Sequence, residues 1–120
     1  MARILAVDDS RSMRQMVAFT LSSAGHEIAE AEDGQQALNL AQSGAFDLVL
    51  ADVNMPVMDG ISLVRKLREL PSYRFTPVLM LTTEAGDDKK SEGRSAGATG
   101  WIVKPFNPEQ LLSTISRVLS

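Results

Sequence analysis

Residues 46–60, FDLVLADVNMPVMDG, show the pattern from which the fold of this chain can be predicted. Residues 46–51 are mostly apolar and predict a buried strand that runs directly into Asp52. The loop that follows contains Pro56 and Gly60, and residues 61–70 then have the spacing of apolar side chains typical of an amphipathic helix. A continuously apolar strand that leads through a loop into a helix is one βα unit of a parallel sheet.

The same unit recurs on both sides of this stretch. Ser10 is predicted to cap the first helix, and Gly25 to follow its end because glycine tolerates a positive φ. Apolar runs at residues 4–7, 78–81 and 101–103 predict the first, fourth and fifth strands, and residues 27–31, in which two glutamates stand among apolar residues, predict the second. The other amphipathic stretches, which predict helices, are residues 10–24, 34–41, 87–96 and 108–119. Five such units predict an α/β protein: a doubly wound, five-stranded parallel sheet with five helices, in one domain over residues 1–120.

Composition and charge exclude several other kinds of protein. Of the 120 residues, 44% are hydrophobic and 22% charged, which is typical of a globular domain and not of a disordered chain. The absence of cysteine excludes disulfides and cysteine-based zinc sites. No apolar run approaches the roughly 20 residues that span a bilayer, and the first residues have no signal-peptide layout. A net charge of −3 argues against a general nucleic-acid binder. We therefore expect a cytoplasmic protein without membrane insertion and without a nucleic-acid partner.

Polar side chains stand at the ends of four of the predicted strands. Asp8 and Asp9 follow the first strand, Asp52 the third, Thr82 the fourth and Lys104 the fifth. In open parallel sheets, ligands bind beyond the carboxyl ends of the strands, where the strand order reverses. These five side chains are therefore expected to meet in one crevice.

The convergence of these side chains matters more than any one of them. Alone, an aspartate at a strand end is more often a solvated carboxylate or a helix cap, and Lys104 alone is more often a surface lysine. Three carboxylates brought together repel one another and favour a bound cation, and an open all-oxygen site suits Mg²⁺. With a nearby ammonium and hydroxyl, such a site could neutralise the charge of an incoming phosphoryl group.

These residues resemble the response-regulator receiver family, and within it the single-domain chemotaxis regulators. The resemblance covers essentially the whole chain and is carried by motifs at residues 8–9, 52–60, 82 and 104–106. It implies the flavodoxin-like strand order 2-1-3-4-5, which is a known property of the chemotaxis member and comes from the resemblance alone.

The resemblance also implies a metal site and a phosphoacceptor. Asp52 would accept the phosphoryl group from a histidine kinase. Asp9 and Asp52 would bind Mg²⁺, for which Mn²⁺ could substitute, and Asp8 would act on the ion directly or through water. The main-chain carbonyl of Asn54 would be a further ligand.

The remaining implied roles concern the phosphoryl group and the signal. Thr82 and Lys104 would contact phosphoryl oxygens, and the peptide bond before Pro105 would be cis. Thr82 and the fifth-strand residue Trp101 would form the switch. Trp101 departs from the family, which commonly has Tyr or Phe there.

Asn54 and Glu84 occupy the positions where receivers vary. They resemble the residues of chemotaxis regulators and suggest a short-lived phosphoryl state.

The chain ends soon after the fifth predicted helix, so we expect no output domain and an action by protein binding alone. The resemblance implies a monomer whose output face spans residues 87–120, with a flagellar motor switch protein as one possible target and a phosphatase as a further partner. It would be no enzyme beyond its own phosphorylation and dephosphorylation. The alternative is a phosphoryl sink, or a receiver that regulates a kinase outside motility.

Two other classes remain open at this point. A phosphohydrolase with an aspartyl-phosphate usually has a second Asp where this chain has Asn54. A flavin-binding protein of the same topology would need a phosphate-binding loop after the first strand. In this chain Asp8 and Asp9 follow that strand and would repel phosphate.

Overall fold

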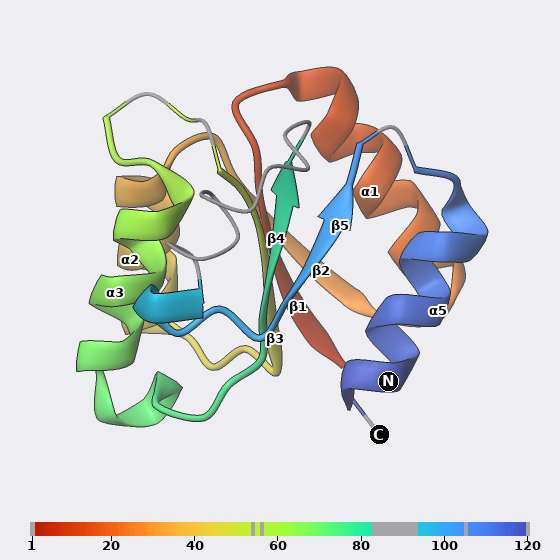
Figure 1. The fold of residues 1–120 in the computed structure, drawn as a ribbon. Coiled ribbons are helices and arrows are strands. Elements are labelled where there is room, and N and C mark those ends of the chain that lie inside the picture. Colours follow the sequence, from red (N-terminus) through yellow and green to blue (C-terminus); the bar gives the residue numbers. More distant parts are fainter. Residues whose placement is uncertain (1, 54, 56, 83–93, 105, 120) are drawn as a thin grey trace.

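A five-stranded parallel sheet forms the centre of the molecule (Figure 1). The computed structural model of the protein describes residues 2–53, 55, 57–82, 94–104 and 106–119. The sheet order is β2-β1-β3-β4-β5, which confirms the order expected from the resemblance. The strands are β1 (Arg3–Val7), β2 (Glu27–Ala31), β3 (Leu48–Asp52), β4 (Val78–Thr82) and β5 (Gly100–Val103).

Helices cover both faces of the sheet, so the doubly wound α/β class is confirmed. Figure 1 shows α2 and α3 on one side and α1 and α5 on the other. Of the predicted helix at residues 87–96, the first seven residues lie outside the described part of the chain, and residues 94–96 are helical. The described helices are α1 (Arg11–Ser23), α2 (Gly34–Ser43), α3 (Gly60–Glu69), the short 3-10 helix η1 (Pro71–Tyr73) and α5 (Pro108–Leu119).

Local sequence explains where α1 begins and ends. The Ser10 hydroxyl accepts a hydrogen bond from the Met13 amide at 3.3 Å, as its predicted role as a cap requires. Gly25 follows the helix with a φ of +94°, a conformation that glycine adopts without steric cost. Both predictions are confirmed.

Each face of the sheet has its own core. Towards α2 and α3, apolar side chains including Val49, Met80 and Leu67 are fully buried. Towards α1 and α5, Leu50, Leu21 and Leu111 are fully buried as well. Burying a side chain of this size contributes about 1.5–3 kcal/mol, so the two cores hold the strand ends firmly in place.

The strands differ in burial. β1, β3 and β4 are buried along almost their whole length, whereas β2 and β5 are only partly buried. These two strands form the edges of the sheet, where only one neighbour covers them. Helices on both faces of the sheet therefore still leave these two edge strands partly exposed.

Arg68 joins three segments on the α3 side of the molecule. Its guanidinium donates hydrogen bonds to the carbonyls of Tyr73 and Thr76, both at 2.6 Å, and to that of Gly97 at 2.8 Å. Gly97 has a φ of +109°, and a β-carbon there would lie 3.0 Å from the Arg68 side chain. The end of α3, the connection to β4 and the approach to β5 are thus fastened together.

The amino ends of the strands lie opposite to the polar residues singled out above. Ala2, just before β1, and Leu119, at the end of α5, line the same surface depression at that end. Within the described residues, no helix is long and apolar enough to span a membrane.

Candidate functional site

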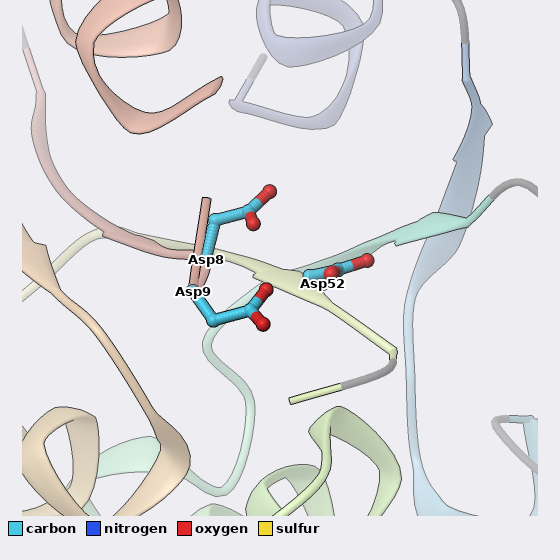
Figure 2. A group of neighbouring side chains, drawn as sticks. All are labelled: Asp8, Asp9 and Asp52. Atoms are coloured by element: carbon cyan, nitrogen blue, oxygen red, sulfur yellow. The ribbon is translucent and has the colours of Figure 1, made fainter. Parts of the chain in front are cut away.

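The strand order reverses between β1 and β3, because the chain passes from β1 outward to β2 and then returns to the other side of β1. The carboxyl ends of β1 and β3 are therefore neighbours, with Val7 paired in register with Ala51. Asp8 and Asp9 follow Val7, and Asp52 follows Ala51. Figure 2 shows their three carboxylates together, and one oxygen from each lies within 4.8 Å of the others. The predicted convergence of the three aspartates is confirmed by this geometry.

Asp8 is fixed on every side. Its amide donates to the Ala31 carbonyl at 3.1 Å, which ties it to the end of β2. One carboxylate oxygen accepts the Ser10 amide at 2.9 Å, and the other accepts the Lys104 ammonium at 3.1 Å. The residue is almost fully buried, so its orientation is set before any ligand arrives.

Lys104 joins the two carboxylates that lie deepest. Its ammonium nitrogen is 3.1 Å from an Asp8 oxygen and 3.3 Å from an Asp52 oxygen, and only 13% of its side chain is exposed. The Lys104 amide donates to the Thr82 carbonyl at 2.7 Å, which holds the end of β5 against the end of β4. The lysine predicted for this site is therefore part of it.

Asp52 is an ionisable group in an unfavourable place. Burial raises the pKa of the Asp52 carboxyl above its usual value, the Lys104 ammonium opposes that rise, and Asp8 and Asp9 add to it. The ionised carboxylate would be stabilised by a cation, so the electrostatics of the site match the chemistry expected from the sequence.

Gly60 allows the phosphoacceptor candidate and α3 to approach closely. A β-carbon on Gly60 would collide with the Asp52 carbonyl and with the end of the Met80 side chain. The Gly60 amide donates to the Val53 carbonyl at 2.9 Å, and the preceding Asp59 caps α3 by accepting the Ser62 amide at 2.7 Å. The Asp-Gly pair thus starts the helix directly beneath the site.

Thr82 and Trp101 lie on the same face of the sheet. Side chains alternate along a strand, and Met80, two residues before Thr82, belongs to the core on the α3 side. Trp101 pairs with Met80 in register and packs against the same core while remaining partly exposed. Thr82 is buried, so the two predicted switch residues are diagonal neighbours on two paired strands.

The donor set fits Mg²⁺. The three carboxylates supply only oxygen ligands, two of them are buried, and Asp9 is exposed, which leaves the site open on one side. Mg²⁺ prefers oxygen ligands and usually keeps several waters in an open site. Asp8, Asp9 and Asp52 are the described residues that could hold it.

Several predicted positions cannot be placed. Asn54, Glu84 and Pro105 lie outside the described residues. The same is true of residues 87–93 and 120 in the expected output face. The roles assigned to them stay predictions.

Two residues of interest were not singled out from the sequence. Arg14, on α1, donates to the Asp8 carbonyl at 2.7 Å, and Arg68 fastens the approach to β5. The sequence held one signal for Arg14: it lies near the start of the helix that follows the acidic pair. His26 is partly buried, with its Nδ1 atom accepting the Ala2 amide at 3.1 Å.

The chain belongs to the response regulator receiver domain family, whose model matches residues 4–116. The chain is similar to the chemotaxis protein CheY of Pseudomonas aeruginosa, with 41% identity over 97% of this chain and 94% of that protein. It is also similar to the transcriptional regulatory protein SrrA of Staphylococcus aureus, with 37% identity over 97% of this chain but only 47% of that longer protein.

Solved structures show the same likeness. The chemotaxis protein CheY4 of Vibrio cholerae has a TM-score of 0.97 and 58% identity, over 99% of both chains. The receiver domain of the sensor histidine kinase PA1611 from Pseudomonas aeruginosa has a TM-score of 0.92 and 29% identity, over 98% of this chain and 97% of that one. That second structure is described as having a magnesium ion coordinated in its active-site cleft. The similarity to the receiver family noted from the motifs is thereby confirmed.

Proposed function

We propose that this chain is a phosphorylation-dependent signalling switch, in which Asp52 accepts a phosphoryl group from a histidine kinase in a reaction that requires Mg²⁺ or Mn²⁺. The observation that carries the proposal is the joint placement of Asp8, Asp9 and Asp52 with the Lys104 ammonium between two of them. The receiver family, the magnesium reported for the PA1611 receiver and the CheY relatives support it.

The chemistry follows from what each side chain can do. An Asp52 oxygen attacks phosphorus, and an O–P bond forms while the P–N bond of the kinase phosphohistidine breaks, its electron pair remaining on nitrogen. A bound divalent cation would neutralise charge on the phosphoryl oxygens. Lys104 pairs with a phosphoryl oxygen in place of one carboxylate contact, and the Thr82 hydroxyl donates to another.

Asp8 and Asp9 would hold the cation, and neither would need to move far, because one oxygen of each carboxylate already lies within 4.8 Å of one from Asp52. Such preorganisation is the main means by which a protein can accelerate phosphoryl transfer. The only reactions of the chain would be its own phosphorylation and dephosphorylation, so we do not class it as an enzyme.

The output follows from the second pair of residues. Phosphorylated Asp52 would draw the Thr82 hydroxyl towards it. This movement would vacate space on the α3 face of the sheet, into which Trp101 on the neighbouring strand can move. Trp101 also lines a groove shared by β5 and α5, together with Phe106, Gln110 and Arg117. A protein target that binds this surface would prefer one of the two Trp101 positions.

Similarity to chemotaxis proteins favours a motility target, such as a flagellar motor switch protein, and a phosphatase as a further partner. We place the chain in the cytoplasm on this proposal, because the kinase needs ATP. A phosphoryl sink would share the chemistry and lack the response of Trp101.

The test is phosphoryl uptake from a small phosphodonor such as acetyl phosphate, followed by intact mass. We expect one added phosphoryl group, dependent on Mg²⁺ and cleaved by hydroxylamine, which attacks acyl phosphates. Asp52→Asn should abolish uptake, since an amide cannot attack phosphorus comparably.

Asp33→Asn is the matched control. Asp33 caps α2 by accepting the Gln36 amide at 2.8 Å, and asparagine caps equally well, so this variant should be labelled like the wild type. Undiminished labelling of Asp52→Asn would refute the assignment.

A further inference from the structure

The Arg14 side chain is turned into the protein towards the metal-binding loop. Only 11% of it is exposed, although arginine is mostly an exposed residue. Its Nη1 atom donates to the main-chain carbonyl of Asp8 at 2.7 Å. A short hydrogen bond from a charged donor is among the strong ones, so this contact holds the backbone of the loop.

Two glutamates hold the guanidinium itself. Its Nε atom lies 3.4 Å from a Glu30 oxygen, and its Nη2 atom lies 4.0 Å from a Glu32 oxygen. Glu30 belongs to β2, and Glu32 follows it. A guanidinium presents its donors in a rigid planar fork, so contacts to three residues on two neighbouring strand ends fix its orientation.

The consequence falls on Asp9. The peptide between Asp8 and Asp9 is planar, so the direction of the Asp8 carbonyl determines where the Asp9 Cα atom lies. The Asp8 amide is bound to Ala31 and its carbonyl to Arg14, which fixes both sides of the residue. Within the described part of the chain, no hydrogen bond or ion pair holds the Asp9 carboxylate. Its position therefore depends on its backbone.

We propose that Arg14 is a positioning residue of the metal site: by holding the Asp8 carbonyl, it presents the Asp9 carboxylate beside Asp8 and Asp52 before a cation binds. The inference rests on the proposed function, because it assumes that Mg²⁺ binds to these carboxylates.

The charge of Arg14 and its positioning role predict opposite effects of its loss on the affinity for Mg²⁺. Removing a cation from the neighbourhood of a cation site strengthens Mg²⁺ binding by electrostatics, and it leaves Glu30 and Glu32 unpaired, which adds to that effect. Loss of positioning weakens Mg²⁺ binding, and loss of a residue that orients a metal ligand typically weakens metal affinity by about 10- to 100-fold. The sign of the change therefore separates the two roles.

The experiment is Mg²⁺ titration by calorimetry of the wild type, Arg14→Gln and Arg14→Lys. We expect the Mg²⁺ Kd of Arg14→Gln to rise about tenfold. Arg14→Lys, which keeps the charge but loses the fork, should show a smaller rise. At saturating Mg²⁺ the phosphorylation rate of both variants should recover towards that of the wild type.

Arg68→Gln is the matched control, since Arg68 is also an arginine that binds main-chain carbonyls, in a different part of the fold. It should lower the melting temperature and leave the Mg²⁺ Kd unchanged. A second readout needs no metal: hydrogen exchange of the Ser10 amide, which donates to Asp8, should quicken in Arg14→Gln and not in Arg68→Gln.

The outcomes are separable. A Mg²⁺ Kd for the Arg14 variants that is unchanged or lower than in the wild type overturns the inference and leaves the proposed function standing. A wild type that binds no Mg²⁺ at millimolar concentration overturns both. If Arg14→Gln does not fold, Arg14→Lys decides by the same criterion.

Discussion

Asp52 has a side chain that is only 12% exposed, beside one ammonium and two further carboxylates. Burial raises its pKa, and Lys104 only partly offsets this effect. An ionised carboxylate in this buried environment lowers the free energy of unfolding. The size of the effect can be measured because it depends on pH.

The sign follows from the direction of the shift. The unfolded carboxyl titrates at about 3.9, and the folded one at a higher pH, so between these values the folded state binds more protons. The stabilisation that protonated Asp52 gives the folded state is complete below the pKa of the unfolded carboxyl. It is lost as the pH rises through the pKa of the folded carboxyl. Ionised Asp52 therefore destabilises the metal-free fold at neutral pH.

Asp52→Asn should accordingly melt at a higher temperature than the wild type at pH 7 without divalent cations. The difference should shrink as the pH falls towards about 4, where the wild-type carboxyl is protonated. Thermal melts in EDTA across this range provide the measurement. A difference that stays constant with pH would contradict a raised pKa for Asp52.

At the scale of the elements, β4 and β5 connect the site to the outer edge of the sheet. Thr82 ends β4, and Trp101 lies on β5, on the same face. Among the described residues, β5 has a neighbouring strand on one side only, so a tryptophan on it can shift with fewer contacts to break than one on a central strand.

A beryllofluoride mimic of the phosphoryl group should therefore change the emission of Trp101, the only tryptophan of the chain. The comparison is made at constant Mg²⁺, because the ion alone can alter the emission. Thr82→Ala should remove the response, since the hydroxyl is the proposed link. Thr76→Ala, which removes an exposed hydroxyl, is the control and should respond normally. If the mimic binds and Trp101 emission stays constant, the chain is better described as a phosphoryl sink.

The strands, the limits of α1 and the site residues could be predicted from the sequence. Continuous apolar runs predicted four of the five strands, and Ser10 and Gly25 predicted the limits of α1, because these signals are local; β2 contains Glu27 and Glu30 and was recognised from its place between two predicted helices. The polar strand ends predicted the site because one rule of parallel sheets brings them together.

The features that could not be predicted depend on contacts distant in the chain. Arg68 reaches Gly97, which is 29 residues away, and Arg14 finds its glutamates only once β2 lies beside β1. The 3-10 helix η1 could not be recognised from the sequence, because three residues carry too little periodicity. The partial exposure of β2 and β5 depends on which strands form the edges; the strand order implied by the resemblance gives that, whereas an apolar run alone does not.

On the scale of the whole molecule, the acidic cluster links ion binding to stability. An ion that binds only the folded state stabilises it by about 2.7 kcal/mol at one hundred times its Kd. Mg²⁺ should thus raise the melting temperature of the wild type.

Asp9→Ala should raise the melting temperature of the metal-free protein, by relieving repulsion among the carboxylates, and should abolish the effect of Mg²⁺. Differential scanning calorimetry with and without Mg²⁺ measures both. NaCl at equal ionic strength controls for general ionic effects. A wild-type melting temperature that does not respond to millimolar Mg²⁺ would speak against a metal site at this cluster.

The depression shared by Ala2 and Leu119 has a consequence for how such a domain can be built into larger proteins. Both residues lie at the amino ends of the strands, and the acidic cluster lies at the carboxyl ends. A linker, a tag or a second domain attached there would lie at the amino ends of the strands and leave the acidic cluster accessible. We therefore expect that the protein can be immobilised through a fusion at either terminus without obstructing the binding of a kinase.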